Sequence, residues 1–183
     1  QYLAGQNKMV YYDPATGHML YGFQKINGKT YYFAPGSGAR FSGQIKLSGY
    51  WYLFSDKDGV MQTGFQYLAG QKKTVYYDPA TGHMLYGLQK INGKTYYFAP
   101  GSGARVVGQI KINGKWYMFD KKTGVMQTGF HYIASQKKTV YYSPKTGQML
   151  YGLQKINGKW YMFDKRSGAK ISYQTVGTYI RLK

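Results

Sequence analysis

The sequence predicts an all-β fold, a β-solenoid of tandem β-hairpins with about three hairpins per superhelical turn. Three observations predict it: a glycine recurs at regular intervals, as in Gly22, Gly43 and Gly64, Asn-Gly pairs separate short apolar runs, and 19% of the 183 residues are aromatic. Asn-Gly between apolar runs indicates a hairpin, because both turn residues must tolerate positive φ. A lone two-stranded hairpin is marginal in water, so such units must stack on one another.

Three kinds of repeat alternate, and the set of three returns at Gly87 and again at Gly152. The first kind begins at Gly22, the second at Gly43, and the third, which has two extra residues, at Gly64. Residues 1–21 match the third kind without its first two residues, so we expect the parent protein to extend further N-terminally. The predicted repeats are 1–21, 22–42, 43–63, 64–86, 87–107, 108–128, 129–151 and 152–172, and a C-terminal capping hairpin at 173–183 follows them.

Each repeat is expected to form one hairpin. In the repeat at 22–42, a strand ending at Ile26 leads through Asn27-Gly28 into a second strand ending at Phe33. A turn rich in glycine and proline follows, at 34–38. The third kind is expected to have a longer hairpin loop. A column of methionines two residues after the closing glycines is expected to pack under these turns.

Side chains alternate along a strand, so each strand has two faces. The fourth residue after each opening glycine is always apolar, as in Ile26 and Leu47, and is expected in the core. The first and third residues lie on the opposite face, where Phe, Leu, Gln, Lys and Tyr occur. That mixed face is where a ligand is expected to bind. Most aromatic residues of the second strands are expected to pack between hairpins.

Composition excludes several kinds of chemistry. The chain has 25 Lys+Arg against 6 Asp+Glu, all of them Asp, and no Cys, for a net charge of +19. Paired carboxylates, thiol nucleophiles and cysteine-based zinc sites are therefore not expected. Every candidate group recurs, whereas catalysis needs one preorganised site. We therefore expect no enzyme activity, no cofactor, no metal site and no membrane span.

The motif Gly-Phe/Gln…Asn-Gly-Lys-Trp/Thr-Tyr…Phe…Gly-Val-Met-Gln-Thr-Gly resembles the cell-wall-binding repeat superfamily, which includes choline-binding and glucan-binding repeats. The resemblance covers all but the last eleven residues. It implies a secreted protein of the Gram-positive cell surface, in which the repeats target a parent such as a wall hydrolase or glucansucrase to a surface polymer. Choline cages of the family resemble two Trp and one Tyr. Here Phe, Gln or Leu follows the opening glycine, so choline is disfavoured, and the second Trp persists only as Trp51, Trp116 and Trp160.

The resemblance favours α-glucan pockets. Such pockets look like an aromatic ring from one hairpin and a Gln-x-Lys pair from the next, whose amide and ammonium grip sugar hydroxyls. Gln44 with Lys46 and Gln109 with Lys111 match that pair. The candidate rings are Tyr21, Tyr86, Tyr32 and Tyr97, and Trp51 and Trp116 complete the candidate ligand-binding set.

Other partners stay open. A net charge of +19 attracts polyanions, so one alternative is mainly electrostatic binding to teichoic or lipoteichoic acid. A choline-type site and a structural spacer or adhesin are further alternatives. Basic surfaces with aromatic residues also bind single-stranded nucleic acid, but the repeat pattern disfavours that partner.

Overall fold

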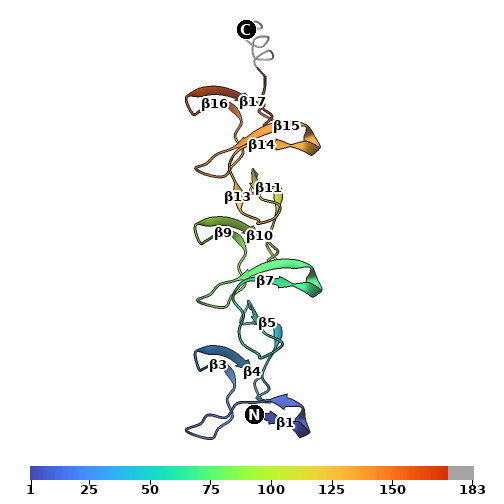
Figure 1. Ribbon diagram of the computed structural model, residues 1–183, viewed down its shortest axis with the longest axis vertical. Helices are drawn as coiled ribbons and strands as arrows, with labels where there is room; N and C mark the ends of the chain where they lie inside the picture. Colours follow the sequence, from blue (N-terminus) through green and yellow to red (C-terminus); the bar gives the residue numbers. More distant parts are fainter. Residues whose placement is uncertain (173–183) are drawn as a thin grey trace. The chain divides into compact units, whose positions relative to one another are not determined.

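The computed structural model describes residues 1–172, and it is a succession of antiparallel hairpins (Figure 1). The predicted cap at 173–183 lies outside the described residues. The chain begins with β1 (Tyr2–Leu3), η1 (Ala4–Gln6) and β2 (Lys8–Met9). The five-residue strands are β3 (Gly22–Ile26), β4 (Lys29–Phe33), β5 (Gly43–Leu47), β6 (Tyr50–Phe54), β7 (Gly64–Leu68), β8 (Lys73–Tyr77), β9 (Gly87–Ile91), β10 (Lys94–Phe98), β11 (Gly108–Ile112), β12 (Lys115–Phe119), β14 (Gly129–Ile133), β15 (Lys138–Tyr142), β16 (Gly152–Ile156) and β17 (Lys159–Phe163). The remaining elements are η2 (Ala69–Gln71), η3 (Ala134–Gln136) and β13 (Met126–Gln127), which pairs with β12.

The hairpin turns form where the sequence predicts them. Asn27 and Gly28 have φ angles of 49° and 77°, the positive pair that a two-residue primed turn requires. Ser48 and Gly49 take the same conformation, with φ of 48° and 88°. In the third kind of repeat the loop is longer, as expected: η2 follows β7, and Lys72, with φ of 48°, donates its N–H to the Ala69 carbonyl. Each hairpin falls inside one predicted repeat, although the partition into eight repeats stays a prediction.

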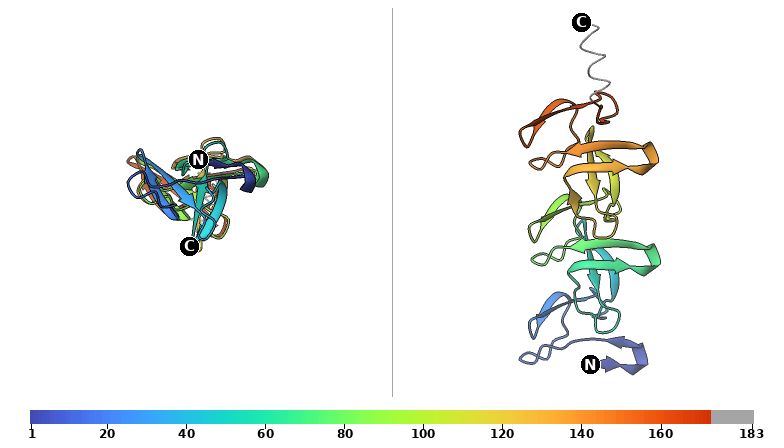
Figure 2. Two further views of the ribbon diagram at one scale, coloured as in Figure 1. Left: turned by 90° about the horizontal axis from the view of Figure 1, so that it is seen from below. Right: turned by 45° about the horizontal axis from the view of Figure 1, so that its top comes forward.

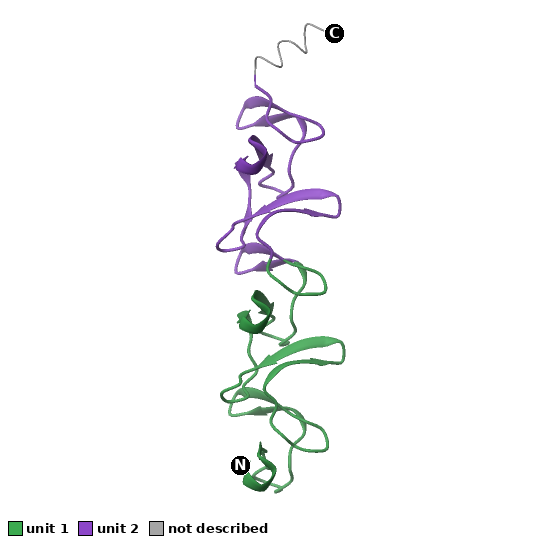
Figure 3. Ribbon diagram, turned by 90° about the vertical axis from the view of Figure 1, so that its right-hand side faces the viewer, with its two compact units in different colours: residues 1–87, 98–105 green, residues 88–97, 106–183 purple. Residues whose placement is uncertain are grey.

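The described residues divide into two compact units, drawn in green and purple in Figure 3. The first comprises Gln1–Gly87 and Phe98–Arg105, and the second comprises Leu88–Tyr97 and the chain from Val106 onward. Within the first unit, the hairpins β1–β2 and β7–β8 project in the same direction, and β3–β4 projects differently (Figures 1 and 2). Within the second unit, β9–β10 and β16–β17 likewise share a direction. The direction therefore returns after three hairpins, which confirms the predicted fold class.

Successive repeats are joined by backbone hydrogen bonds and by buried rings. The N–H of Met61 donates to the Thr30 carbonyl at 2.8 Å, and the N–H of Met84 donates to the Trp51 carbonyl at 2.9 Å. The last aromatic residue of each second strand forms the floor of the core, since Phe54 is 1% exposed and Tyr77 is fully buried. In the first compact unit the core therefore lies between successive hairpins, as the aromatic columns predict.

The methionine column packs under the turns, as expected. A Cβ built on Gly82 would lie 2.6 Å from the Met61 Sδ, and one built on Gly103 would lie 2.8 Å from the Met84 Sδ. Each of these closing glycines therefore makes room for the methionine of the preceding repeat. The same glycines also have positive φ, so two independent constraints select glycine there.

Candidate ligand-binding site

Aromatic residues gather where one hairpin packs on the next, and the junction between the β3–β4 and β5–β6 hairpins shows the arrangement. At this first aromatic cluster, Phe23 on β3 contacts Tyr32 on β4 of its own hairpin and Tyr52 on β6 of the next hairpin. The ring centroid of Phe23 lies 5.1 Å from that of Tyr32 and 4.9 Å from that of Tyr52. Cross-strand register places Phe23 opposite Tyr32, which accounts for the first contact. Phe23 is 44% exposed, whereas both tyrosines are buried.

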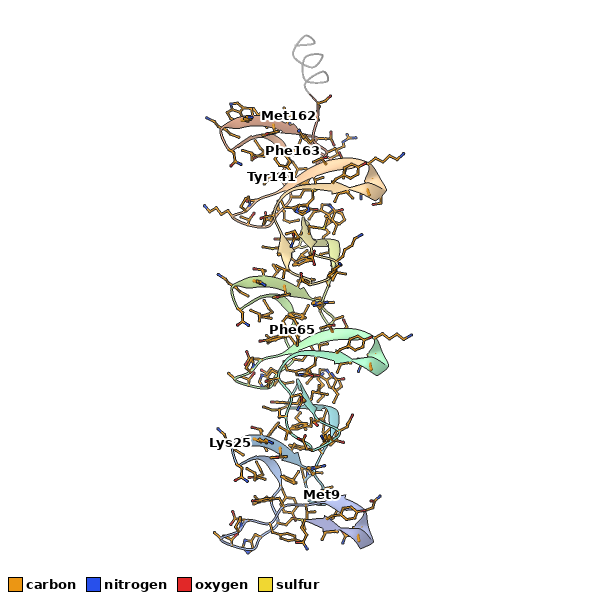
Figure 4. The ribbon with its side chains drawn as sticks, in the orientation of Figure 1. Met9, Lys25, Phe65, Tyr141, Met162 and Phe163 are labelled. Atoms are coloured by element: carbon orange, nitrogen blue, oxygen red, sulfur yellow. The ribbon has the colours of Figure 1, made fainter. Side chains whose placement is uncertain are left out.

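A last aromatic cluster in the second compact unit repeats this geometry. Phe130 on β14 lies 4.7 Å from Tyr141 on β15 and 5.2 Å from Tyr161 on β17, centroid to centroid. Phe163 forms the floor, 6.2 Å from Tyr141, and Figure 4 labels both of these rings. In the first compact unit, Phe65, also labelled in Figure 4, contacts Tyr76 in the same way at 4.9 Å. An exposed ring over more deeply buried tyrosines is therefore a recurring surface feature.

The second kind of repeat lacks this exposed ring, because glutamine takes its place. The Gln44 Nε2 donates to the Tyr77 hydroxyl at 2.8 Å, and the Gln109 Nε2 donates to the Tyr142 hydroxyl at 2.7 Å. Burial raises the pKa of Tyr77 and of Tyr142 to about 12, and the glutamine hydrogen bond opposes this shift by favouring the phenolate. At these junctions a polar pair therefore replaces the aromatic cluster.

The sequence-predicted residues differ in burial: some are exposed, some are partly buried against a core cluster, and two tyrosines are buried. Lys46 and Lys111 are exposed, and each lies directly across the hairpin from a tryptophan, Trp51 or Trp116. Both tryptophans are partly buried and pack against the clusters that contain Tyr77 and Tyr142. Tyr86 packs against the same cluster as Trp51, and Tyr21 is exposed. Tyr32 and Tyr97 are buried, packed with Tyr52 and Tyr117 respectively.

Gln44 and Tyr32 therefore face different neighbours. Gln44 contacts Tyr77 of the following repeat, and its Oε1 accepts a hydrogen bond from the Gln71 Nε2 at 3.0 Å. Tyr32 packs instead with Tyr52 and Phe54 on β6. The structure thus brings Gln44, Trp51 and Tyr86 together around Tyr77, an arrangement that differs from the expected pairing of Gln44 with Tyr21 or Tyr32.

The sequence places the exposed phenylalanines on the face where a ligand is expected, but the candidate ligand-binding set includes neither them nor their partner tyrosines on the next hairpin. The signal was present: Phe occupies the position after the opening glycine in Phe23, Phe65 and Phe130. Phenylalanine at this position does not by itself indicate a choline site, because the choline cages of the family resemble two Trp and one Tyr. In residues 1–172, no group of three or more metal-ligating side chains exists, and no helix has the length and hydropathy of a membrane span.

Comparisons with protein families match repeats in both halves of the sequence. A choline-binding repeat matches residues 85–129, and a cell wall binding repeat matches residues 22–39, 45–61 and 152–169. A search of curated proteins finds no match. Both matched models describe repeats, and neither describes a catalytic domain. The chain therefore contains cell wall binding repeats of the choline-binding type, and the expected glucan-binding preference has no support in these matches.

Solved structures agree on the fold. CbpJ from Streptococcus pneumoniae TIGR4 is 28% identical with a TM-score of 0.79, and the match covers 88% of this chain and 56% of that one. Choline binding protein F from Streptococcus pneumoniae is 26% identical with a TM-score of 0.76, covering 91% of this chain and 55% of that one. The autolysin LytC from the same organism shares the fold at 21% identity and a TM-score of 0.61, covering 95% of this chain and 39% of its own. The chain thus spans about half the length of the first two.

Proposed function

We propose that this chain is a non-catalytic module that binds choline on the teichoic acids of a bacterial cell wall and so holds a secreted protein at the cell surface. The observation that carries the proposal is the first aromatic cluster, Phe23 with Tyr32 and Tyr52, and its counterpart at Phe130. The choline-binding repeat matched at residues 85–129 supports the same ligand. The proposal replaces the α-glucan preference that the sequence suggested.

Aromatic rings suit a quaternary ammonium for an electrostatic reason. The π face of a ring is negative, so a cation that gives up little hydration is attracted to it, by about 0.5–2 kcal/mol for each ring. Phe23 is 44% exposed above two buried tyrosines, so a methylated ammonium can contact its open face and the rim of the cluster. Phenylalanine binds a cation more weakly than tryptophan does, so each site is expected to be weak and the array to act through multivalency.

The positive charge fits a polymer that carries phosphate as well as choline. The chain has a net charge of +19, and most of its lysines, including Lys46 and Lys111, are exposed. Some lysines are structural: the Lys73 Nζ donates to the Ser102 carbonyl, joining two repeats. The exposed lysines attract phosphates of the backbone, and this attraction offsets repulsion of the ammonium group. Roles for Gln44 and Gln109 in ligand binding stay predictions.

The test is calorimetric titration of the chain with choline. Phe23→Ala is expected to remove one site, because it deletes the exposed ring and leaves Tyr32 and Tyr52 in place. Leu88→Ala is the matched control, since Leu88 holds the same position in the next repeat of the first kind without supplying a ring. Leu88→Phe is expected to add a site. Unchanged choline binding in Phe23→Ala would contradict the proposal.

A polymer assay separates this proposal from electrostatic binding. We expect the chain to be retained on teichoic acid that carries choline and to be eluted by free choline. Retention on choline-free teichoic acid that disappears in high salt would favour the electrostatic alternative, because screening weakens charge attraction beyond about 10 Å at 0.1 M salt. Elution by dextran instead of choline would favour α-glucan.

A further inference from the structure

The last aromatic cluster already holds a cation, and that cation belongs to the chain itself. The Lys170 Nζ lies 5.1 Å from the centroid of Tyr161 and 5.7 Å from the centroid of Phe130. Both distances lie within the roughly 6 Å range of a cation–π contact. Backbone contacts hold Lys170 in place: its N–H donates to the Thr139 carbonyl at 2.7 Å, and it forms an isolated antiparallel β-bridge with Phe163. The ammonium thus already makes, with two rings of the cluster, the kind of contact that a quaternary ammonium ligand would make.

The position of Lys170 is special in the repeat pattern. It lies two residues after a closing glycine, where the second and third kinds of repeat have methionine, as in Met61 and Met84. The first kind has a cation there in every copy, as Arg40, Arg105 and Lys170. A cation that recurs in one kind of repeat and never in the other two indicates a role tied to that junction.

The first aromatic cluster supplies the comparison. Its three rings match those of the last cluster in position and spacing, and its exposed ring is as open, since Phe23 is 44% exposed and Phe130 is 43% exposed. The residue that corresponds to Lys170 is Met61, which packs against the buried rings Tyr52 and Phe54. At this position the first cluster has a thioether and the last cluster has an ammonium group. The first cluster also has Phe41, whose ring centroid lies 6.4 Å from that of Tyr32, and a hydrogen bond between the Tyr52 hydroxyl and the His83 Nε2.

We propose that Lys170 is a specificity-determining residue that occupies the last aromatic cluster as an internal cation and weakens choline binding there, whereas Met61 places no competing charge at the first cluster. The inference rests on the proposed function. A ligand at the last cluster must displace the Lys170 ammonium from two rings and then lie beside it, so it meets both lost attraction and charge repulsion. Together these lower the affinity of that cluster for choline on the order of tenfold.

The test compares choline binding in the full chain and in Lys170→Met. Methionine is the native residue of this column in neighbouring repeats, so the variant is expected to fold. At a choline concentration near the dissociation constant of the wild type, Lys170→Met is expected to bind up to one more choline per chain. The gain must vanish in Lys170→Met with Phe130→Ala, which lacks the exposed ring. Lys159→Met removes the same charge from the exposed first residue of β17 and is expected to show no gain.

The reciprocal variant is Met61→Lys, which is expected to lose the site that Phe23→Ala loses. A second readout needs no ligand: ring currents of Tyr161 and Phe130 should shift the Lys170 ε-methylene proton signals upfield, and Phe130→Ala should reduce this shift. If Phe23→Ala loses a site but Lys170→Met gains none, the inference is overturned and the proposed function stands. If wild type binds no choline and Lys170→Met does, the competing role of Lys170 stands, but the available first cluster and the proposed function of the native chain both fail. No choline binding in either overturns both.

Discussion

Replacing Gly168 by alanine should destabilise the fold more than replacing Gly152 by alanine. The two glycines have nearly equal φ angles, 69° and 70°, so an alanine at either position incurs the same penalty for a left-handed backbone. They differ in surroundings: a Cβ at Gly168 would lie 2.7 Å from the Met149 Cε, whereas one at Gly152 would meet nothing within 4 Å. The pair therefore separates backbone strain from side-chain packing.

The magnitudes follow from these two contributions. A non-glycine residue in the left-handed region costs about 1–2 kcal/mol, and this is the whole expected effect of Gly152→Ala. Met149 is only 4% exposed, so its side chain has no open space into which to retreat. Overpacking of a filled core adds about 1–3 kcal/mol. Gly168→Ala is therefore expected to lower the free energy of unfolding by about 2–5 kcal/mol.

Urea denaturation, followed by near-ultraviolet circular dichroism and tryptophan fluorescence, measures the difference. Trp116 packs against the cluster that contains Met149, so its emission reports on that region. Met149→Ala completes a double-mutant cycle: in its background, the cost of Gly168→Ala should fall to that of Gly152→Ala. Equal costs for the two glycine variants, or a cycle with no coupling, would refute the packing argument.

Three further predictions follow from local geometry. The Tyr142 phenol should ionise near pH 12 in a spectrophotometric titration, so the stability that its raised pKa contributes is complete below pH 10 and is lost as pH rises through about 12. Gln109→Leu removes the hydrogen bond that favours the phenolate and should raise this pKa further; the same Tyr142 pKa in Gln109→Leu and wild type would count against the hydrogen bond. Asn92→Ala should cost about 1 kcal/mol in thermal unfolding because Asn92 has a φ of 48°, whereas Asn92→Gly should be nearly neutral; equal losses would contradict the primed turn. The backbone N–H of Thr123 holds the pKa of Asp120 below its ordinary 3.8, so Asp120→Ala should lower the melting temperature above that pH, with the difference shrinking as pH falls through the lowered pKa; a difference independent of pH would contradict it.

The fold could be predicted because the same hairpin pattern occurs in every repeat. The recurring turn glycines, the Asn-Gly pairs and the apolar position at Ile26 each specify part of one hairpin, and the copies agree. The site was harder because it is shared between hairpins. Phe23 forms part of the candidate site only together with Tyr52, which lies on the next hairpin. Stacking of the hairpins brings the two rings together, and no local sequence pattern predicts that contact.

The glutamines show that a local pattern can also suggest a ligand contact where the structure has an internal one. Gln44 has the residue type and spacing of a sugar-binding side chain, yet its amide lies against the Tyr77 hydroxyl of the next repeat. Strand alternation places Gln44 on the face opposite Leu47, but the stacking of the next repeat covers part of that face. Lys170 likewise belongs to a column of packing residues, and the ring distances are what distinguish it from Met61.

The hydrogen bonds between successive repeats, such as that from Met61 to Thr30, have a consequence for how the gene can change. These bonds join adjacent repeats, and the kinds of junction return with each set of three. Recombination that duplicates or deletes a whole set preserves each junction. Loss of a single repeat of the second kind instead puts the first kind directly before the third, an order that the array does not contain, so that Phe23 would face Val75 where Tyr52 now stands. Copy number in this array should therefore drift in steps of three.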